Sequence, residues 1–223
     1  MRRAFTVCLI LAFLSASCAS YTQQSVAKPT VGSAAFSREE QGLFVGITPY
    51  LEGEKSKKIF DADLKQARIL ALQVVVGNSG SRLLAVRKSD FILRLPDGKE
   101  YVPVPSANVV TRLESIGGVV GATIAFGLIG LLVATSAKNE ADSNRRVDFQ
   151  SKEFQDATLP SGESAHGYLY FIMPDDVREL KDPTMVARGL DVAGGANITV
   201  MVPLGTLGVW KVQEAPTAQR PNF

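Results

Sequence analysis

The residue types that support nucleophilic catalysis come closest together at Gly162-Glu163-Ser164-Ala165-His166. This stretch approaches the nucleophile-elbow pattern G-x-S-x-G, but a histidine replaces the final glycine that permits the strained turn of an elbow. In an extended strand, Ser164 and His166 would point to the same side with Cα atoms about 7 Å apart, which is not by itself a catalytic geometry. We therefore expect no enzymatic activity, and the pattern favours a turn that leads into a strand.

The chain also has few residues that could bind a metal or form a disulfide. His166 is the only histidine of the chain, and Cys8 and Cys18 are its only cysteines. A zinc site needs several histidine or cysteine ligands, and a disulfide needs two cysteines in the mature chain. We therefore expect no metal, no cofactor and no disulfide.

Cys18 is the residue whose surroundings indicate a definite modification. The chain begins with two arginines and a short apolar run, Val7 to Leu14, which is too short for a permanent membrane helix of about 20 residues. The approach to the cysteine, Leu14-Ser15-Ala16-Ser17-Cys18, resembles the lipobox of bacterial lipoproteins. The resemblance implies that residues 1–17 are a signal peptide and that Cys18 carries lipid. Cleavage without acylation is the alternative.

The charge balance excludes a nucleic-acid surface. The chain has 24 Lys+Arg and 22 Asp+Glu, and two of the arginines lie in the signal segment, so the mature protein is close to neutral. Binding to phosphates would need a basic stripe. The short basic clusters, such as Lys55, Lys57 and Lys58, are interrupted by acidic residues and are typical of a solvated surface. The remaining length suits one domain with its own core.

Short runs of β-branched and aromatic residues predict an antiparallel β protein. Pro96-Asp97-Gly98 and Gly194-Gly195-Ala196-Asn197 are typical hairpin turns. The nearly continuous apolar run 167–172 suits a strand buried between two sheets. We expect strands at residues 43–51, 69–77, 83–86, 90–95, 100–104, 165–173, 185–192 and 198–204, whereas the segment around 57–66 is either a helical turn or an edge strand.

These strands and turns resemble the immunoglobulin-like modules of bacterial envelope proteins. The resemblance rests on the turn after VVVGNSG, on the hairpin LPDGKEY and on the late segment LPSGESAHGYLYF. It implies an immunoglobulin-like β-sandwich, and it implies almost nothing about function.

A stretch of 23 residues without a charge, Ser115 to Ala137, lies between the two groups of strands. As one helix it would be about 34 Å long, against about 30 Å for the apolar core of a bilayer. Glycine is a poor helix former in water, but small residues at four-residue spacing allow close helix contact in lipid. The predicted helix-contact residues are Gly117, Gly121, Ala125, Gly130 and Ala134.

Three arrangements of this stretch remain open. A single spanning helix would place the two groups of strands on opposite sides of a membrane. A helical hairpin that turns near Phe126-Gly127 would return the chain to the same side. A long apolar helix that lies along the sheets or on a partner subunit would need no lipid.

The apolar stretch and the polar segment RRVDFQSKEFQDATLPSGESAHG that follows it are together similar to uncharacterised Gram-negative lipoproteins in which a glycine-zipper segment interrupts a domain. This resemblance implies a cell-envelope location. The residue after Cys18 is Ala19 and not aspartate, and in this the chain resembles lipoproteins that are sorted to the outer membrane and face the periplasm.

The sequence thus predicts a mainly β chain interrupted by an apolar helical insertion. We expect a non-catalytic, lipid-anchored envelope protein. Its sandwich binds a protein partner or a second copy, and residues 115–137 enter the membrane or self-associate. A periplasmic carrier or sensor of a small amphiphile is the alternative. The expected organisation is a signal peptide (1–17), a flexible tether (18–40), the first part of the sandwich (41–110), the insertion (111–148), the second part of the sandwich (149–210) and a disordered tail (211–223).

Overall fold

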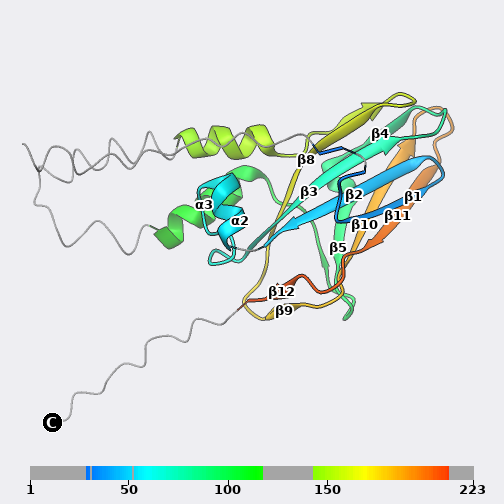
Figure 1. Cartoon of the computed structure of the whole chain (residues 1–223). Coiled ribbons are helices and arrows are strands. Elements are labelled where there is room, and N and C mark those ends of the chain that lie inside the picture. The colour runs from blue at the N-terminus through cyan, green and yellow to red at the C-terminus, as the bar shows by residue number, and fades with distance from the viewer. Residues whose placement is uncertain (1–28, 31, 52, 118–142, 211–223) are drawn as a thin grey trace, which may run out of the picture.

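The protein has three layers, which are two antiparallel sheets packed on one another and a helical layer on the outer face of one of them (Figure 1). The structure is a computed structural model, and it describes residues 29–30, 32–51, 53–117 and 143–210.

Sheet A has four strands in the order β1-β2-β3-β8. β3 precedes the apolar stretch in the sequence and β8 follows it, yet the two pair antiparallel from Ile69 opposite Ile172 to Gly77 opposite Ser164. The two groups of strands therefore share one sheet. The strands are β1 (Phe36–Glu40), β2 (Leu43–Tyr50), β3 (Ile69–Asn78) and β8 (Ser164–Ile172).

Sheet B is built around β10, which pairs with β11 on one side and with β4 and β5 on the other. β6 pairs with β5 and β7 pairs with β4, while β9 and β12 form a separate two-stranded sheet. The bounds are β4 (Leu84–Val86), 3-10 turn η1 (Lys88–Asp90), β5 (Phe91–Arg94), β6 (Glu100–Tyr101), β7 (Ala157–Leu159), β9 (Glu179–Leu180), β10 (Thr184–Asp191), β11 (Asn197–Pro203) and β12 (Gly208–Val209).

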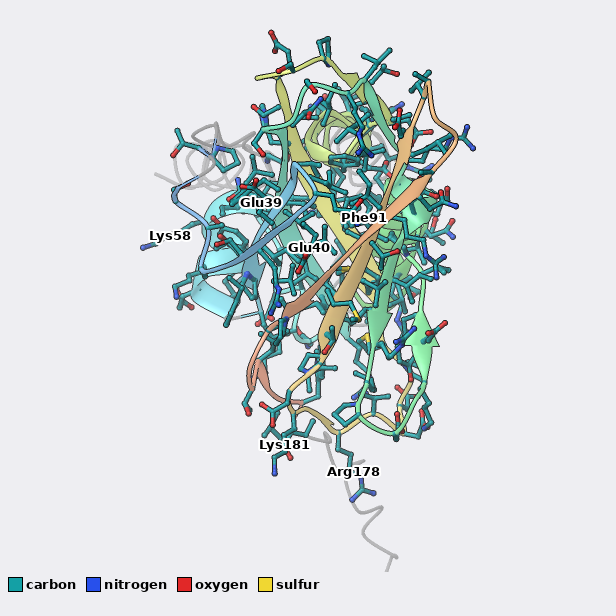
Figure 2. The ribbon with its side chains drawn as sticks, turned by 90° about the vertical axis from the view of Figure 1, so that its right-hand side faces the viewer. Glu39, Glu40, Lys58, Phe91, Arg178 and Lys181 are labelled. Carbon is teal, nitrogen blue, oxygen red and sulfur yellow. The ribbon has the colours of Figure 1, made fainter. Side chains whose placement is uncertain are left out.

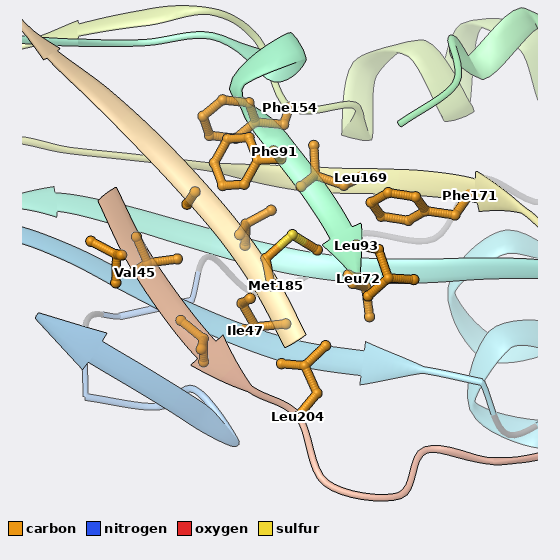
Figure 3. Packing of buried hydrophobic residues seen from close by; sticks show 14 of the residues in the cluster. Val45, Ile47, Leu72, Phe91, Leu93, Phe154, Leu169, Phe171, Met185 and Leu204 are labelled. Carbon is orange, nitrogen blue, oxygen red and sulfur yellow. The ribbon is translucent and has the colours of Figure 1, made fainter. Parts of the chain in front are cut away.

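The main core lies between the two sheets (Figure 3). Alternate residues of each strand point inward, as the strict alternation of buried and exposed positions along β11 shows. Phe91 of β5 packs edge-on against Phe154 at a centroid distance of 5.3 Å. Figure 2 shows the opposite orientation for charged side chains such as Lys58 and Lys181, which point away from the body. Burial of each large apolar side chain in the main core contributes about 1.5–3 kcal/mol.

The helical layer covers the outer face of the first part of β3, at Ile69 and Ala71. It consists of α2 (Gly53–Phe60), α3 (Ser106–Gly117) and a helix over residues 143–152. Phe60, Val109, Val110 and Phe149 form a second core with the outer face of sheet A. Because this part of β3 meets sheet B on one face and helices on the other, its sequence is apolar without alternation.

The mainly β, antiparallel prediction is confirmed, and each predicted strand has a counterpart with shifted ends. The run 100–104 is shorter than expected, because only Glu100–Tyr101 pairs with β5. The undecided segment before β3 contains α2 and a non-helical connection.

Some elements lie where the sequence predicted something else. β1 falls inside the expected tether, because Gln41 and Gly42 both take positive φ values and turn the chain back onto β2. α3 begins at Ser106, within the part assigned to strands. β7, β9 and β12 were not predicted; each has only two or three residues, too few for a pattern.

Candidate functional site at the base of the apolar stretch

The two helices that flank the apolar stretch lie side by side on the body (Figure 1). Arg146 donates two hydrogen bonds to the Glu114 carboxylate, at 2.9 and 3.1 Å. The Ser106 amide, at the start of α3, donates to Glu153 Oε2 at 3.2 Å. These contacts follow one another in opposite order along the two segments, so α3 and the helix over 143–152 run antiparallel. Residues 117 and 143 therefore lie at the same end of the pair.

Both segments are also hydrogen-bonded to the outer edge of β8. The Val104 amide donates to the Tyr170 carbonyl at 2.8 Å, and the Phe154 amide donates to the Tyr168 carbonyl at 2.9 Å. The chain thus enters and leaves the helical layer two residues apart on one strand. We call α3, the helix over 143–152 and these two anchor points the insertion base.

An aromatic cluster holds the insertion base on sheet A. The ring of Phe60 from α2 stacks on Phe149 at 5.0 Å and meets Tyr168 edge-on at 5.0 Å. The Tyr170 hydroxyl donates to the Phe149 carbonyl at 3.3 Å. Because aromatic pairs prefer offset or edge-to-face contacts, this cluster orients the helices as well as burying area.

One buried and one partly buried ion pair add directional contacts. Lys152, whose side chain is 9% exposed, donates to Asp148 Oδ2 at 2.5 Å and to the Ile59 carbonyl at 2.7 Å. The next residue, Glu153, pairs with Lys88, which precedes β5. A buried pair adds little net stability, but it becomes costly when one partner is lost. The contacts with other segments, from Lys152 to the Ile59 carbonyl and from Lys88 to Glu153, therefore specify where the helix over 143–152 lies.

Tyr168 has the most strongly perturbed titration among the described groups. Burial raises the pKa of its phenol well above the ordinary value, and the neighbouring Tyr50 adds to the shift. The hydroxyl has no hydrogen-bond partner within 3.5 Å among the described residues, although Tyr50 lies beside it. A phenol that stays neutral in an apolar setting is suited to packing, and it offers no base for catalysis.

The residues singled out from sequence fall in several places. Gly117 ends α3, whereas Cys18, Gly121, Ala125, Gly130 and Ala134 lie outside the described residues. Ser164 and His166 are exposed on β8, opposite Gly77 and Val75.

Metal chemistry and membrane spanning are not evident in the described part of the chain. Within the described ranges, no group of three His, Cys, Asp or Glu is placed to bind a metal. None of the helices described there is both long and apolar enough to cross a membrane.

Sequence reasoning missed the ion pairs of the insertion base. The spacing of Asp148 and Lys152, four residues apart, is the signal for a helical ion pair, but the same spacing occurs on exposed helices. Glu153 had no such signal, because its partners Lys88 and Ser106 are distant in the sequence.

Comparison with known proteins assigns neither family nor activity. No protein-family description matches the chain, and no curated protein matches it. Similar solved structures include the yjhA protein from Bacillus subtilis, with 14% identity and a TM-score of 0.38, covering 75% of this chain and 96% of that one.

Two further structures give the same result. A "putative lipoprotein (ycdA)" from Bacillus subtilis has 15% identity and a TM-score of 0.36, covering 75% of this chain and 38% of that one. A functionally unknown protein from Listeria monocytogenes has 11% identity and a TM-score of 0.37, covering 77% and 82%. A lipoprotein is thus among the similar structures, but likeness at this level supports no argument about fold family or function.

Proposed function

We propose that this protein is a non-catalytic, lipid-anchored component of the bacterial cell envelope, at the outer membrane and facing the periplasm. In this proposal Cys18 carries the acyl chains. Residues 115–137 provide a second apolar attachment, either to lipid or to a second copy of the chain. Two attachments are physically reasonable, because one acyl chain alone holds a protein only marginally at a membrane.

The observation that carries the proposal is the insertion base. Aromatic packing and the Lys88–Glu153 pair hold the helix over 143–152 on the body. α3 is held by the burial of Val109 and Val110 and by the hydrogen bond from Ser106 to Glu153. These two helices flank the uncharged stretch in the sequence. An exposed stretch of 23 residues without a charge would be very unfavourable in water. A rigid support at both ends suits a segment that must be presented to a membrane or a matching helix.

The β body is proposed to bind a protein partner, and an immunoglobulin-like sandwich is the arrangement we propose for it. Its support is the outer face of sheet B, which no described helix covers. Met201 on that face is 53% exposed, whereas Val186, which lies opposite it, is buried. Val102, just after β6, is 62% exposed. Exposed large apolar side chains, where they gather on one face, are typical of contact surfaces.

Flotation with lipid vesicles tests the membrane attachment apart from the acyl chains. The protein for this test is residues 19–223, because every described contact is made by residues 29–210 and none requires the first 18 residues. We expect the protein to float with vesicles of phosphatidylethanolamine and phosphatidylglycerol. The double variant Leu131→Lys/Leu132→Lys should lose at least tenfold in the floated fraction, because each charge costs about 2.5–3.5 kcal/mol in the bilayer centre.

Thr111→Lys is the matched control, because Thr111 is exposed on α3 and lies outside the apolar stretch. Equal flotation of the control and a loss with the double variant would support the proposal. A wild-type protein that stays in the soluble fraction at every lipid concentration would contradict membrane attachment through residues 115–137.

A further inference from the structure

We infer that two copies of the chain associate face to face through the outer face of sheet B, about a two-fold axis that runs between β10 and β5. The inference rests on the proposed role of the β body in protein binding and deepens it, because it names the partner as a second copy of this chain. The helical layer lies on the far side of sheet A, so no described helix covers this face (Figure 1).

The first observation is a row of four apolar side chains across the outer face of sheet B. Met201 of β11 lies opposite Val186 of β10, which lies opposite Ile92 of β5. β6 pairs with β5 through Tyr101, and one further place in this register sets Val102 beside Ile92. The row therefore extends across the sheet from β11 to the residue after β6.

The two ends of this row are exposed to solvent. Met185, which precedes Val186 in β10, belongs to the main core, and successive side chains of a strand point to opposite faces. Val186 therefore faces outward, although its neighbours leave it only 2% exposed. Met201 at one end is 53% exposed and Val102 at the other is 62% exposed. The row is thus closed in the middle and open at both ends.

A two-fold axis between β10 and β5 makes the row complementary to itself. The axis exchanges the two halves of the row, so Met201 of one copy meets the partner's Val102, and Val186 meets the partner's Ile92. Symmetric dimers use the same patch on both subunits in this reciprocal way. Each exposed end then lies against an exposed end of the other copy, and both are removed from water.

The charges beside the row follow the same symmetry. β10 continues past the pairing of Ala187 with Phe91, and the next place in this register sets Asp90 beside Arg188. Arg188 is exposed, and neither it nor Asp90 makes an ion pair within the described part of the chain. The same axis brings Arg188 of each copy to the partner's Asp90. The dimer therefore gains two reciprocal ion pairs that one copy lacks.

The charge pattern favours a second copy over an anionic membrane. On the other side of the apolar row, Arg94 and Glu100 pair with each other at 2.7 Å. An anionic lipid surface is bound by an excess of basic side chains, whereas here each arginine stands beside an acidic residue. Such a face is complementary in charge to itself, and complementary charges fix the register of an interface.

Site-specific cross-linking tests the inference in residues 19–223, which contain no cysteine. Met201→Cys and Val102→Cys proteins are mixed in equal amounts in a mild non-ionic detergent and treated with bis-maleimidoethane. We expect a cross-linked dimer that contains one copy of each variant. Each variant alone should give at least tenfold less, since its two equivalent positions are offset by three strand spacings, about 14 Å, in addition to the gap between the sheets. A mixture that cross-links no better than the single variants would overturn the inference.

Thr111→Cys, an exposed position in the helical layer, replaces Val102→Cys in the matched control mixture. This mixture should give no more cross-linked dimer than the single variants. Equal cross-linking of every mixture would show non-specific association and would also overturn the inference. Association through residues 115–137 would not select Met201 and Val102.

Flotation with lipid vesicles, measured on the same samples, separates this inference from the membrane proposal. A protein that floats without the specific cross-link would overturn the dimer and leave membrane attachment standing. A protein that cross-links as expected but does not float would support the dimer and contradict membrane attachment.

A charge reversal tests the position of the axis. Arg188→Glu, added to both cysteine variants, should lower the yield of cross-linked dimer at least fivefold, because each glutamate would meet the partner's Asp90. Lys58→Glu makes the same change of charge at an exposed position of α2 and should leave the yield within twofold. Equal yields with the two reversals would overturn the inferred pairing of the two copies.

Discussion

Replacing Gly167 with alanine should destabilise the protein where residues 153–154, which follow the helix over 143–152, meet β8. A Cβ at this position would lie 2.5 Å from the Phe154 Cα and 2.6 Å from the Phe154 backbone nitrogen. Real Cβ atoms essentially never approach other atoms so closely, and a backbone cannot rotate away as a side chain can. Alanine must therefore push residues 153–154 off the strand.

The size of the effect follows from two costs. Overpacking in a close-packed region costs about 1–3 kcal/mol. The displaced segment also weakens the hydrogen bond from the Phe154 amide to the Tyr168 carbonyl, a contribution of about 1 kcal/mol. We expect the free energy of unfolding to fall by about 3 kcal/mol. For a domain of about 150–250 residues, this corresponds to a decrease in Tm of about 6–12 °C.

Urea and thermal unfolding, followed by circular dichroism, measure this change. Gly32→Ala is the matched control, because its added Cβ would meet no atom within 4 Å and its φ is not positive. We expect the control to stay within about 0.5 kcal/mol of the wild type. A Gly167→Ala protein as stable as this control would refute the reasoning that the close backbone approach requires glycine.

Three further predictions concern the same layer and the apolar stretch. Because burial raises the pKa of Tyr168, the folded state keeps a proton that the unfolded chain releases near pH 10. Stability should therefore fall as the pH rises above about 10, and Tyr168→Phe should lessen that fall in urea titrations; an unchanged pH profile would contradict this. Lys152→Met should cost about 3 kcal/mol by leaving Asp148 buried without this partner, whereas Asp148→Leu/Lys152→Met should recover most of the loss. Additive losses in that double-mutant cycle would show no coupling. Gly121→Leu should weaken detergent-resistant self-association without unfolding the body, and an unaltered oligomer on gels would count against the helix-contact prediction.

The strands of the body were predictable because each carries its own signal. β-branched and aromatic runs marked β2, β3, β8, β10 and β11, and turn residues marked their hairpins. The shortest strands were not predictable. β7 has three residues and β9 has two, and such segments become strands only because the folded protein places another short segment, β4 or β12, beside them as a hydrogen-bonding partner.

The candidate site was predictable only in part. The apolar stretch stands out by composition, since 23 consecutive residues lack a charge. Its support does not stand out, because Lys88, Ser106 and Glu153 are separated by up to 65 positions and meet only in the folded protein. The sequence likewise gave no reason for a glycine at position 167. The reason is the close approach of the Phe154 backbone, which only the structure shows.

Local chemistry along the chain was enough to determine the antiparallel β class, the position of the hairpins and the existence of an uncharged segment, because each depends on neighbouring residues alone. Tertiary structure decided that the two halves form common sheets and that the chain before and after the uncharged segment is hydrogen-bonded to β8, at Val104 and at Phe154. These features depend on hydrogen bonds, aromatic contacts and buried charges between distant residues. A pattern of residues adjacent in the sequence does not predict these contacts, because they form and contribute to stability only once the sheets have assembled.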